Sequence, residues 1–275
     1  SNTAVGAYAL DSNTTGGNNT AVGESALQTN TTGQYNTAIG LQALELSTTA
    51  SYNTSVGYKS TEDNTTGTRN TALGYIALNS NTTADDNTAV GNQALTGTTT
   101  GASNTAVGSK ALENNTTGDS LTAIGYQALK ANTTANHNVA VGHEVLTANT
   151  TGTLNVGLGN YALTANTTGD SNTAVGTNTL EANTTADNNV AVGYKALELN
   201  TTGAENVAVG TLTLDACTSG TRNVAVGRSA LSSLTTGHDN CAFGQDAGFS
   251  ITTTHNNIAI GKTAGYGITT GAYNI

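Results

Sequence analysis

A glycine recurs every seventeen residues from Gly6 to Gly261, without one insertion or deletion. Sixteen copies of this repeat and three further residues account for all 275 positions. Numbered from its first asparagine (Asn2 is position 1), the repeat reads Asn-Thr/Val-Ala-Val/Ile-Gly-x-x-Ala-Leu-x-x-Asn-Thr-Thr-Gly/Ala-x-x. An invariant period indicates that each unit stacks on the next with the same geometry, because a longer unit would break the register of all later ones.

A period of seventeen residues distinguishes between helical and β-solenoid repeats. Helical hairpin repeats need roughly 30 residues or more, and Gly, Thr, Asn and Val form helices poorly. The chain is therefore predicted to be all-β, a parallel β-solenoid of about sixteen 17-residue coils forming one repeat domain over residues 1–275. Two short strands are expected in each coil, one over residues 3–5 and one near residues 9–10 or 13–15. Glycine, or Gly/Ala, is expected at the corners, where a positive φ is least costly.

Stacking explains the abundance of asparagine and threonine. Adjacent coils of such a fold lie about 4.8 Å apart, so identical side chains form ladders along the axis. An asparagine ladder can satisfy its own amides from coil to coil. Three structural ladders are predicted, and their first members are Asn2, Asn19 and Asn36; Gly6, Gly23 and Gly40; and Thr14, Thr31 and Thr48.

Large apolar residues are scarce, with roughly one Val and one Leu in each repeat. Burial of each contributes about 1.5 to 3 kcal/mol, whereas ordering a residue costs about 1 to 2 kcal/mol. Residues 3–5 are apolar on both faces of the expected strand, which is typical of a strand buried on both sides. We therefore expect partner copies of the chain, packed against the face lined by Ala4, Ala21 and Ala38 and by Ala72, Ala89 and onward.

Later units read Asn-Val-Ala-Val-Gly at 189–193, 206–210 and 223–227. This pattern resembles the head repeats of trimeric autotransporter adhesins. It is also similar to the repeat tracts of phage tail-fibre and bacterial surface-fibre proteins that end in a self-cleaving chaperone. The resemblance implies a homotrimeric, left-handed parallel β-roll that serves as a rigid extracellular stalk or adhesive shaft on a virion or cell. The expected partners are copies of the chain itself, in a homotrimer or a head-to-tail filament, and glycans or a host-surface receptor.

The last two units change together from about residue 240 onward. Position 9 becomes Gly248 and Gly265 instead of Leu, and position 12 becomes Ile251 and Ile268 instead of Asn. We infer that the lost Leu and the gained Ile face the same interior. The resemblance suggests that such units lead to a following C-terminal domain.

Ten Asn-Thr-Thr sequons predict a glycan at one exposed corner of most coils, on Asn or on Thr. The candidate glycosylation sites are Asn13, Asn30, Asn64, Asn81, Asn115, Asn132, Asn149, Asn166, Asn183 and Asn200.

Two other surface functions are open alternatives. An outward Asn-x-Thr ladder predicts ice binding through regularly spaced hydroxyl and methyl groups. Tyr58, Tyr75, Tyr126 and Tyr194 share position 6, which suggests carbohydrate or receptor binding.

Catalytic and metal-binding patterns are absent from the sequence. His238 and His255 share one repeat position, but no carboxylate recurs with them, so a metal site is not expected. Eight scattered basic residues and a net charge of −10 argue against nucleic acid as a partner. No apolar run reaches the length of a membrane span. The sequence predicts a non-enzymatic structural fibre protein without cofactors, outside the cell.

Overall fold

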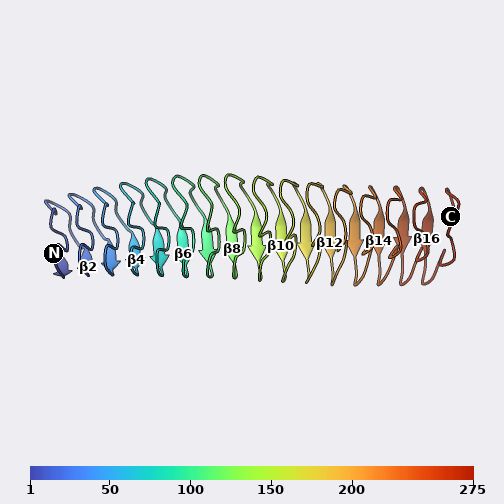
Figure 1. The fold of residues 1–275 in the computed structure, drawn as a ribbon, viewed down its shortest axis with the longest axis horizontal. Helices are drawn as coiled ribbons and strands as arrows, with labels where there is room; N and C mark the ends of the chain where they lie inside the picture. Colours follow the sequence, from blue (N-terminus) through green and yellow to red (C-terminus); the bar gives the residue numbers. More distant parts are fainter. The chain divides into compact units, whose positions relative to one another are not determined.

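The structure, a computed structural model, describes residues 1–275 and divides them into two compact units, Ser1–His137 and Asn138–Ile275. Each unit is a parallel β-solenoid in which every coil contributes one three-residue strand (Figure 1). Neighbouring strands pair with identical repeat positions opposite one another, as in Thr3↔Thr20 and Val5↔Val22. The predicted fold class is confirmed, and the seventeen-residue period is the offset between paired residues.

The first unit contains eight strands that pair in sequence order. They are β1 (Thr3–Val5), β2 (Thr20–Val22), β3 (Thr37–Ile39), β4 (Thr54–Val56), β5 (Thr71–Leu73), β6 (Thr88–Val90), β7 (Thr105–Val107) and β8 (Thr122–Ile124). The second unit contains eight more. They are β9 (Val139–Val141), β10 (Val156–Leu158), β11 (Thr173–Val175), β12 (Val190–Val192), β13 (Val207–Val209), β14 (Val224–Val226), β15 (Cys241–Phe243) and β16 (Ile258–Ile260). None of the segments is a helix that could cross a lipid bilayer.

The expectation of a second strand in each coil is wrong. Between strands the backbone turns repeatedly through the left-handed region, at positions 7, 9 and 17, as shown by Ser25 (φ 55°), Leu27 (φ 54°) and Tyr35 (φ 57°). Residues in this region cannot continue an extended strand. These turns still bond to adjacent coils: the amide of Leu27 donates to the carbonyl of Ala43 in the next coil at 2.9 Å, and the amide of Ser25 donates to the carbonyl of Ala7 in the preceding coil at 2.9 Å. The glycine expected at position 5 does have a positive φ, as in Gly23 (φ 136°), whereas the position 15 glycines from Gly16 to Gly237 do not. Non-glycine residues make the other left-handed turns of the coil.

The interior of each coil is narrow and contains the alanines of the strand. Ala21 and Ala38 are fully buried, whereas their neighbours Val22 and Ile39 point outward. The expectation that the alanine face packs on other chains is therefore wrong. Space is the reason: where Val145 replaces the usual position 8 alanine, the next coil has Gly157 in its strand, and a β-carbon there would lie 2.5 Å from Val145 Cγ1.

The compensation predicted at the last units is confirmed at Gly248. Leu231 and Ile251 are both buried. A β-carbon built on Gly248 would lie 2.8 Å from Leu231 Cδ2 and 3.1 Å from Ile251 Cδ1. Ile251 therefore occupies the interior space that a position 9 leucine fills in other coils.

Candidate functional site

Two asparagine ladders line the interior, and the first is formed by position 1. The side-chain oxygen of Asn2 accepts from the backbone amide of Asn19 at 2.8 Å, and Asn19 serves Asn36 in the same way at 2.9 Å. The Asn19 side-chain amide donates to the carbonyl of Gly33 at 2.8 Å. The predicted ladder residues thus bond mainly to backbone groups, and each amide fixes the separation of two coils.

Position 12 forms the second ladder, and it contains the ten sequon asparagines. Asn30 Nδ2 donates to Asn13 Oδ1 of the preceding coil at 2.8 Å and to the Gly33 carbonyl at 3.2 Å. Nine of the ten side chains are fully buried, and Asn13 is half-buried. The expectation of an exposed asparagine corner is wrong. A glycan on Nδ2 would replace a donating hydrogen and would have no space inside the coil. The buried members are Asn30, Asn64, Asn81, Asn115, Asn132, Asn149, Asn166, Asn183 and Asn200.

The second ladder is interrupted where position 12 is another residue. Asn30 Oδ1 has no hydrogen-bond partner because the next coil carries Ser47, whose own hydroxyl is also buried and unpaired. The side-chain oxygen of Asn200 is unpaired in the same way, next to Cys217. Burial of an unpaired polar atom costs about 1 to 3 kcal/mol. These interruptions are local weak points in an otherwise satisfied interior.

Threonine at position 13 and glycine at position 5 also contact the next coil. Thr14 Oγ1 donates to the Thr31 carbonyl at 2.8 Å, and Thr31 Oγ1 donates to the Thr48 carbonyl at 3.0 Å. A β-carbon built on Gly6 would lie 2.5 Å from the carbonyl oxygen of Gly23, and Gly6 has φ 132°. Gly23 and Gly40 repeat this arrangement. All three predicted ladders therefore lie where coils touch.

The second threonine of each corner, position 14, behaves differently from the first. Its side chain is exposed in every coil, and its hydroxyl makes no hydrogen bond. We name these sixteen residues the hydroxyl row. They are Thr15, Thr32, Thr49, Thr66, Thr83, Thr100, Thr117, Thr134, Thr151, Thr168, Thr185, Thr202, Ser219, Thr236, Thr253 and Thr270. Sequence reasoning gave both threonines one structural role, although only the first has it.

The outer face of the strands carries positions 2 and 4. In β1–β8, position 2 is always threonine, while position 4 is always aliphatic. In β9–β16 both positions are apolar except at Thr173. Several of these side chains are well exposed, including Val192, Val209, Phe243 and Ile260. The two units therefore present faces of different chemistry from the same backbone.

The tyrosines at position 6 offer ring edges to solvent. Tyr58 and Tyr75, on adjacent coils, are stacked with ring centroids 5.5 Å apart and planes 10° from parallel. The Lys195 ammonium lies 5.7 Å from the ring centroid of Tyr194. Tyr126 is exposed and lies in a coil whose neighbours carry no tyrosine at this position. In this stacked pair, each ring covers one face of the other.

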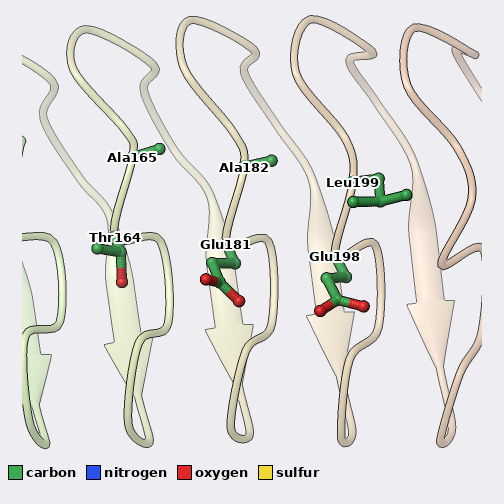
Figure 2. Close-up of a pocket in the computed structure, with 6 residues that line it drawn as sticks. All are labelled: Thr164, Ala165, Glu181, Ala182, Glu198 and Leu199. Carbon is green, nitrogen blue, oxygen red and sulfur yellow. The ribbon is translucent and has the colours of Figure 1, made fainter.

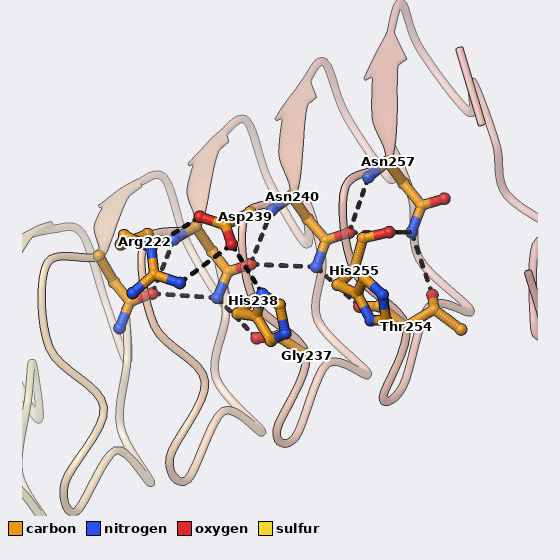
Figure 3. Close-up of polar contacts among 10 residues, drawn as sticks. Arg222, Gly237, His238, Asp239, Asn240, Thr254, His255 and Asn257 are labelled. Atoms are coloured by element: carbon orange, nitrogen blue, oxygen red, sulfur yellow. Dashed lines mark hydrogen bonds and ion pairs between the residues drawn. The ribbon is translucent and has the colours of Figure 1, made fainter. Parts of the chain in front are cut away.

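A cluster of charged and aromatic side chains lies at positions 16 and 17 of the second unit (Figure 3). His238 and His255 stack with ring centroids 4.7 Å apart. Asp239 Oδ1 accepts from Arg222 Nε at 2.7 Å, and Asp239 Oδ2 contacts His238 Nδ1 at 2.7 Å. The hydrogen bond from Arg222, followed by that from His238, lowers the pKa of Asp239. Asp239 thus serves as a bridge between neighbouring coils.

A surface hollow of about 300 Å³ lies in the second unit, formed by positions 10 and 11 of successive coils (Figure 2). Its polar groups are Thr164, Glu181 and Glu198. Glu198 pairs with Lys195 at 2.8 Å, and Glu181 accepts from Asn178 within its own coil. Both carboxylates are therefore engaged by the residue three positions earlier.

The two cysteines are free. Cys217 is buried in the second ladder, and desolvation raises the pKa of its thiol to about 11. Cys241 is half-buried on the outer face of β15. No group of three or more His, Cys, Asp and Glu side chains is arranged so that it could hold a metal ion.

Comparison with known proteins gives no relative: no family model and no curated protein matches the chain. Any function must therefore be argued from the coil itself.

Proposed function

We propose that this chain is a structural segment of an extracellular fibre or filament, such as a phage tail fibre or an adhesin shaft. One observation carries the proposal: three of the most regular positions of the repeat join one coil to the next. Asparagine at position 1, glycine at position 5 and threonine at position 13 all contact the adjacent coil. These regular positions therefore serve the stacking of coils, as expected for a structural rod.

The variable positions support the same proposal. Positions 6, 7, 10, 11, 16 and 17 change residue type from coil to coil and are mainly exposed or half-buried. Charged residues there pair along the surface, as Lys59 does with Glu62 and Arg69 with Asp86. Catalysis requires an acid, base or nucleophile held in a cleft, and these pairs lie on an open surface.

Immunogold labelling tests the fibre proposal directly. Antibodies raised against residues 1–275 should label extended appendages of the source cells or virions. Label found only inside cells would contradict an extracellular fibre.

Self-association is the second part of the proposal, through the outer face of β9–β16. Its two nearly continuous apolar rows extend over roughly 38 Å at about 4.8 Å per strand. With a width of about 10 Å the face covers on the order of 400 Å², a size of apolar patch that marks interaction sites. A second copy of the chain is the occupant we favour, because it repeats every strand spacing and so matches the rows in register. The resemblance to trimeric adhesins implies three copies.

Sedimentation equilibrium measures this association. We expect a mass of three chains of 27.4 kDa for the native sequence and a monomer for the double variant Val192→Lys/Val209→Lys. The control Leu199→Lys/Thr211→Lys adds the same charge at exposed positions away from this face and should stay associated. A native chain that remains monomeric would contradict association without affecting the labelling result.

Ice binding is a second candidate, favoured by the outer face of β1–β8. The Asn-x-Thr version is wrong because the asparagine is buried. The strands instead present a threonine row and an aliphatic row, spaced about 4.8 Å along the axis and about 7 Å along the strand. Thermal hysteresis that Thr54→Lys/Thr71→Lys abolishes would support this function, and its absence in the native chain would exclude it.

A further inference from the structure

Every residue of the hydroxyl row carries a side-chain hydroxyl that makes no contact holding the coils together. All sixteen members carry a hydroxyl, fifteen as threonine and one as Ser219, and all are exposed without a hydrogen bond. The preceding threonine needs its hydroxyl, since Thr31 Oγ1 donates to the next coil. No such contact explains Thr32, its neighbour.

Recent duplication of the repeat does not explain the row either. Other exposed positions in the same coils have diverged widely: position 6 alone includes Tyr58, Asn92, His143, Arg228 and Lys262. A requirement for strand or turn propensity would not select a hydroxyl over valine or asparagine. Ser219 is informative because it keeps the hydroxyl and lacks the methyl group. The retained property is therefore the exposed hydroxyl.

We propose that the hydroxyl row is an acceptor surface for O-linked glycosylation. In this reaction, the threonine Oγ1 attacks the anomeric carbon of a nucleotide- or lipid-activated sugar, supplied with its transferase by the producing cell. The new O–C bond forms as the bond from the anomeric carbon to the phosphate oxygen breaks. The phosphate leaving group takes the electron pair, and the hydroxyl proton passes to a base of the transferase.

Charge favours a neutral sugar over a phosphate on these hydroxyls. The chain already has a net charge of −10, and each phosphate would add about −1.5 to −2 at pH 7. Phosphates on successive coils would lie only about 4.8 Å apart. The position 16 side chains that follow the row include Asp119, Asp170 and Asp187 and no arginine. Neutral sugars avoid this repulsion, although neighbouring ones would touch, so we expect fewer than sixteen per chain.

The same corner disfavours the sequon asparagines as acceptors, because nine of the ten are buried and most, like Asn30 and Asn81, donate both amide hydrogens inside the solenoid. The hydroxyl row and the asparagine ladder thus lie on opposite sides of one short segment. This proposal does not depend on the fibre function, since the acceptor geometry belongs to the coil.

Mass spectrometry of the full chain from its native source tests the proposal. We expect intact masses above that of the polypeptide by multiples of a sugar residue. Electron-transfer fragmentation should place the sugars on members of the row, and alkaline β-elimination, unlike an N-glycanase, should release them.

Variants expressed in the source organism make the test site-specific. Thr32→Val, Thr66→Val and Thr83→Val remove hydroxyls without polar partners and should lose the sugars mapped to those coils. Thr66→Ser is the matched control and should keep its sugar. An unmodified intact mass, phosphate increments, or sugars only on asparagine would overturn the proposal.

Discussion

At the scale of single residues, the interrupted asparagine ladder identifies where the coil can be improved. Ser47→Asn would place an amide between Asn30 and Asn64, whose side chains now lack a ladder partner on that side. We expect the free energy of unfolding to rise by about 1 kcal/mol, the usual net value of one or two hydrogen bonds. Denaturant titration measures it. Ser47→Asp has nearly the same shape as Asn but cannot donate to the Asn30 oxygen, so it should give no gain; an equal gain from both variants would contradict the explanation.

Asp239 should make stability depend on acid. Because Arg222 and His238 lower its pKa in the folded chain, the unfolded chain binds the proton more readily. The stabilisation is present above the unfolded value of about 3.8 and is lost as pH falls below it. NMR titration of the carboxyl group should show its pKa return toward 3.8 in Arg222→Gln. An unchanged titration would show that Arg222 is not the cause.

At the scale of the coil, two glycine positions that look alike should respond differently. Gly108 at position 5 has φ 136°, and a β-carbon there would lie 2.4 Å from the Gly125 carbonyl oxygen. Gly108→Ala should therefore destabilise the chain by about 2 kcal/mol or more. Gly118→Ala, at position 15, should change stability by less than about 1 kcal/mol. A β-carbon there would also lie 2.4 Å from a carbonyl oxygen, that of Ala135. However, Gly118 has no left-handed φ, and Ala50, Ala84 and Ala135 already occupy this position. Thermal denaturation of the two variants compares them; similar losses would contradict the distinction.

The sequence predicted correctly those features of the fold that follow from the seventeen-residue period. Register, parallel pairing and the exchange at Gly248 all follow from positions that stack on their equivalents. The prediction failed for side-chain burial and backbone turns, which depend on the space inside the coil. Hydrophobicity ranks Val22 above Ala21 for burial, yet only the alanine fits, and Leu27 adopts a left-handed φ that its residue type disfavours. The side chain of Asn30 points inward and that of Thr32 points outward. These directions depend on how the backbone turns to close the coil, which the residue types alone do not predict.

At the scale of the whole molecule, coils that contact only their neighbours should fold as a series of coupled units. The segment Ser1–His137 is compact by itself. We expect it to keep its β-sheet circular dichroism when expressed alone and to melt below the full chain, because fewer coils support one another. A spectrum of disordered chain would show that the first unit requires the second.

The side-chain hydrogen bonds between coils also have a direction. Asn19 and Asn30 donate toward the coil before them, while Thr14 donates toward the coil after it. A finished coil therefore presents asparagine side-chain oxygens that can accept hydrogen bonds from the next coil. Synthesis from the amino end would deliver each new coil to a surface that already specifies its register, so that folding could keep pace with the ribosome.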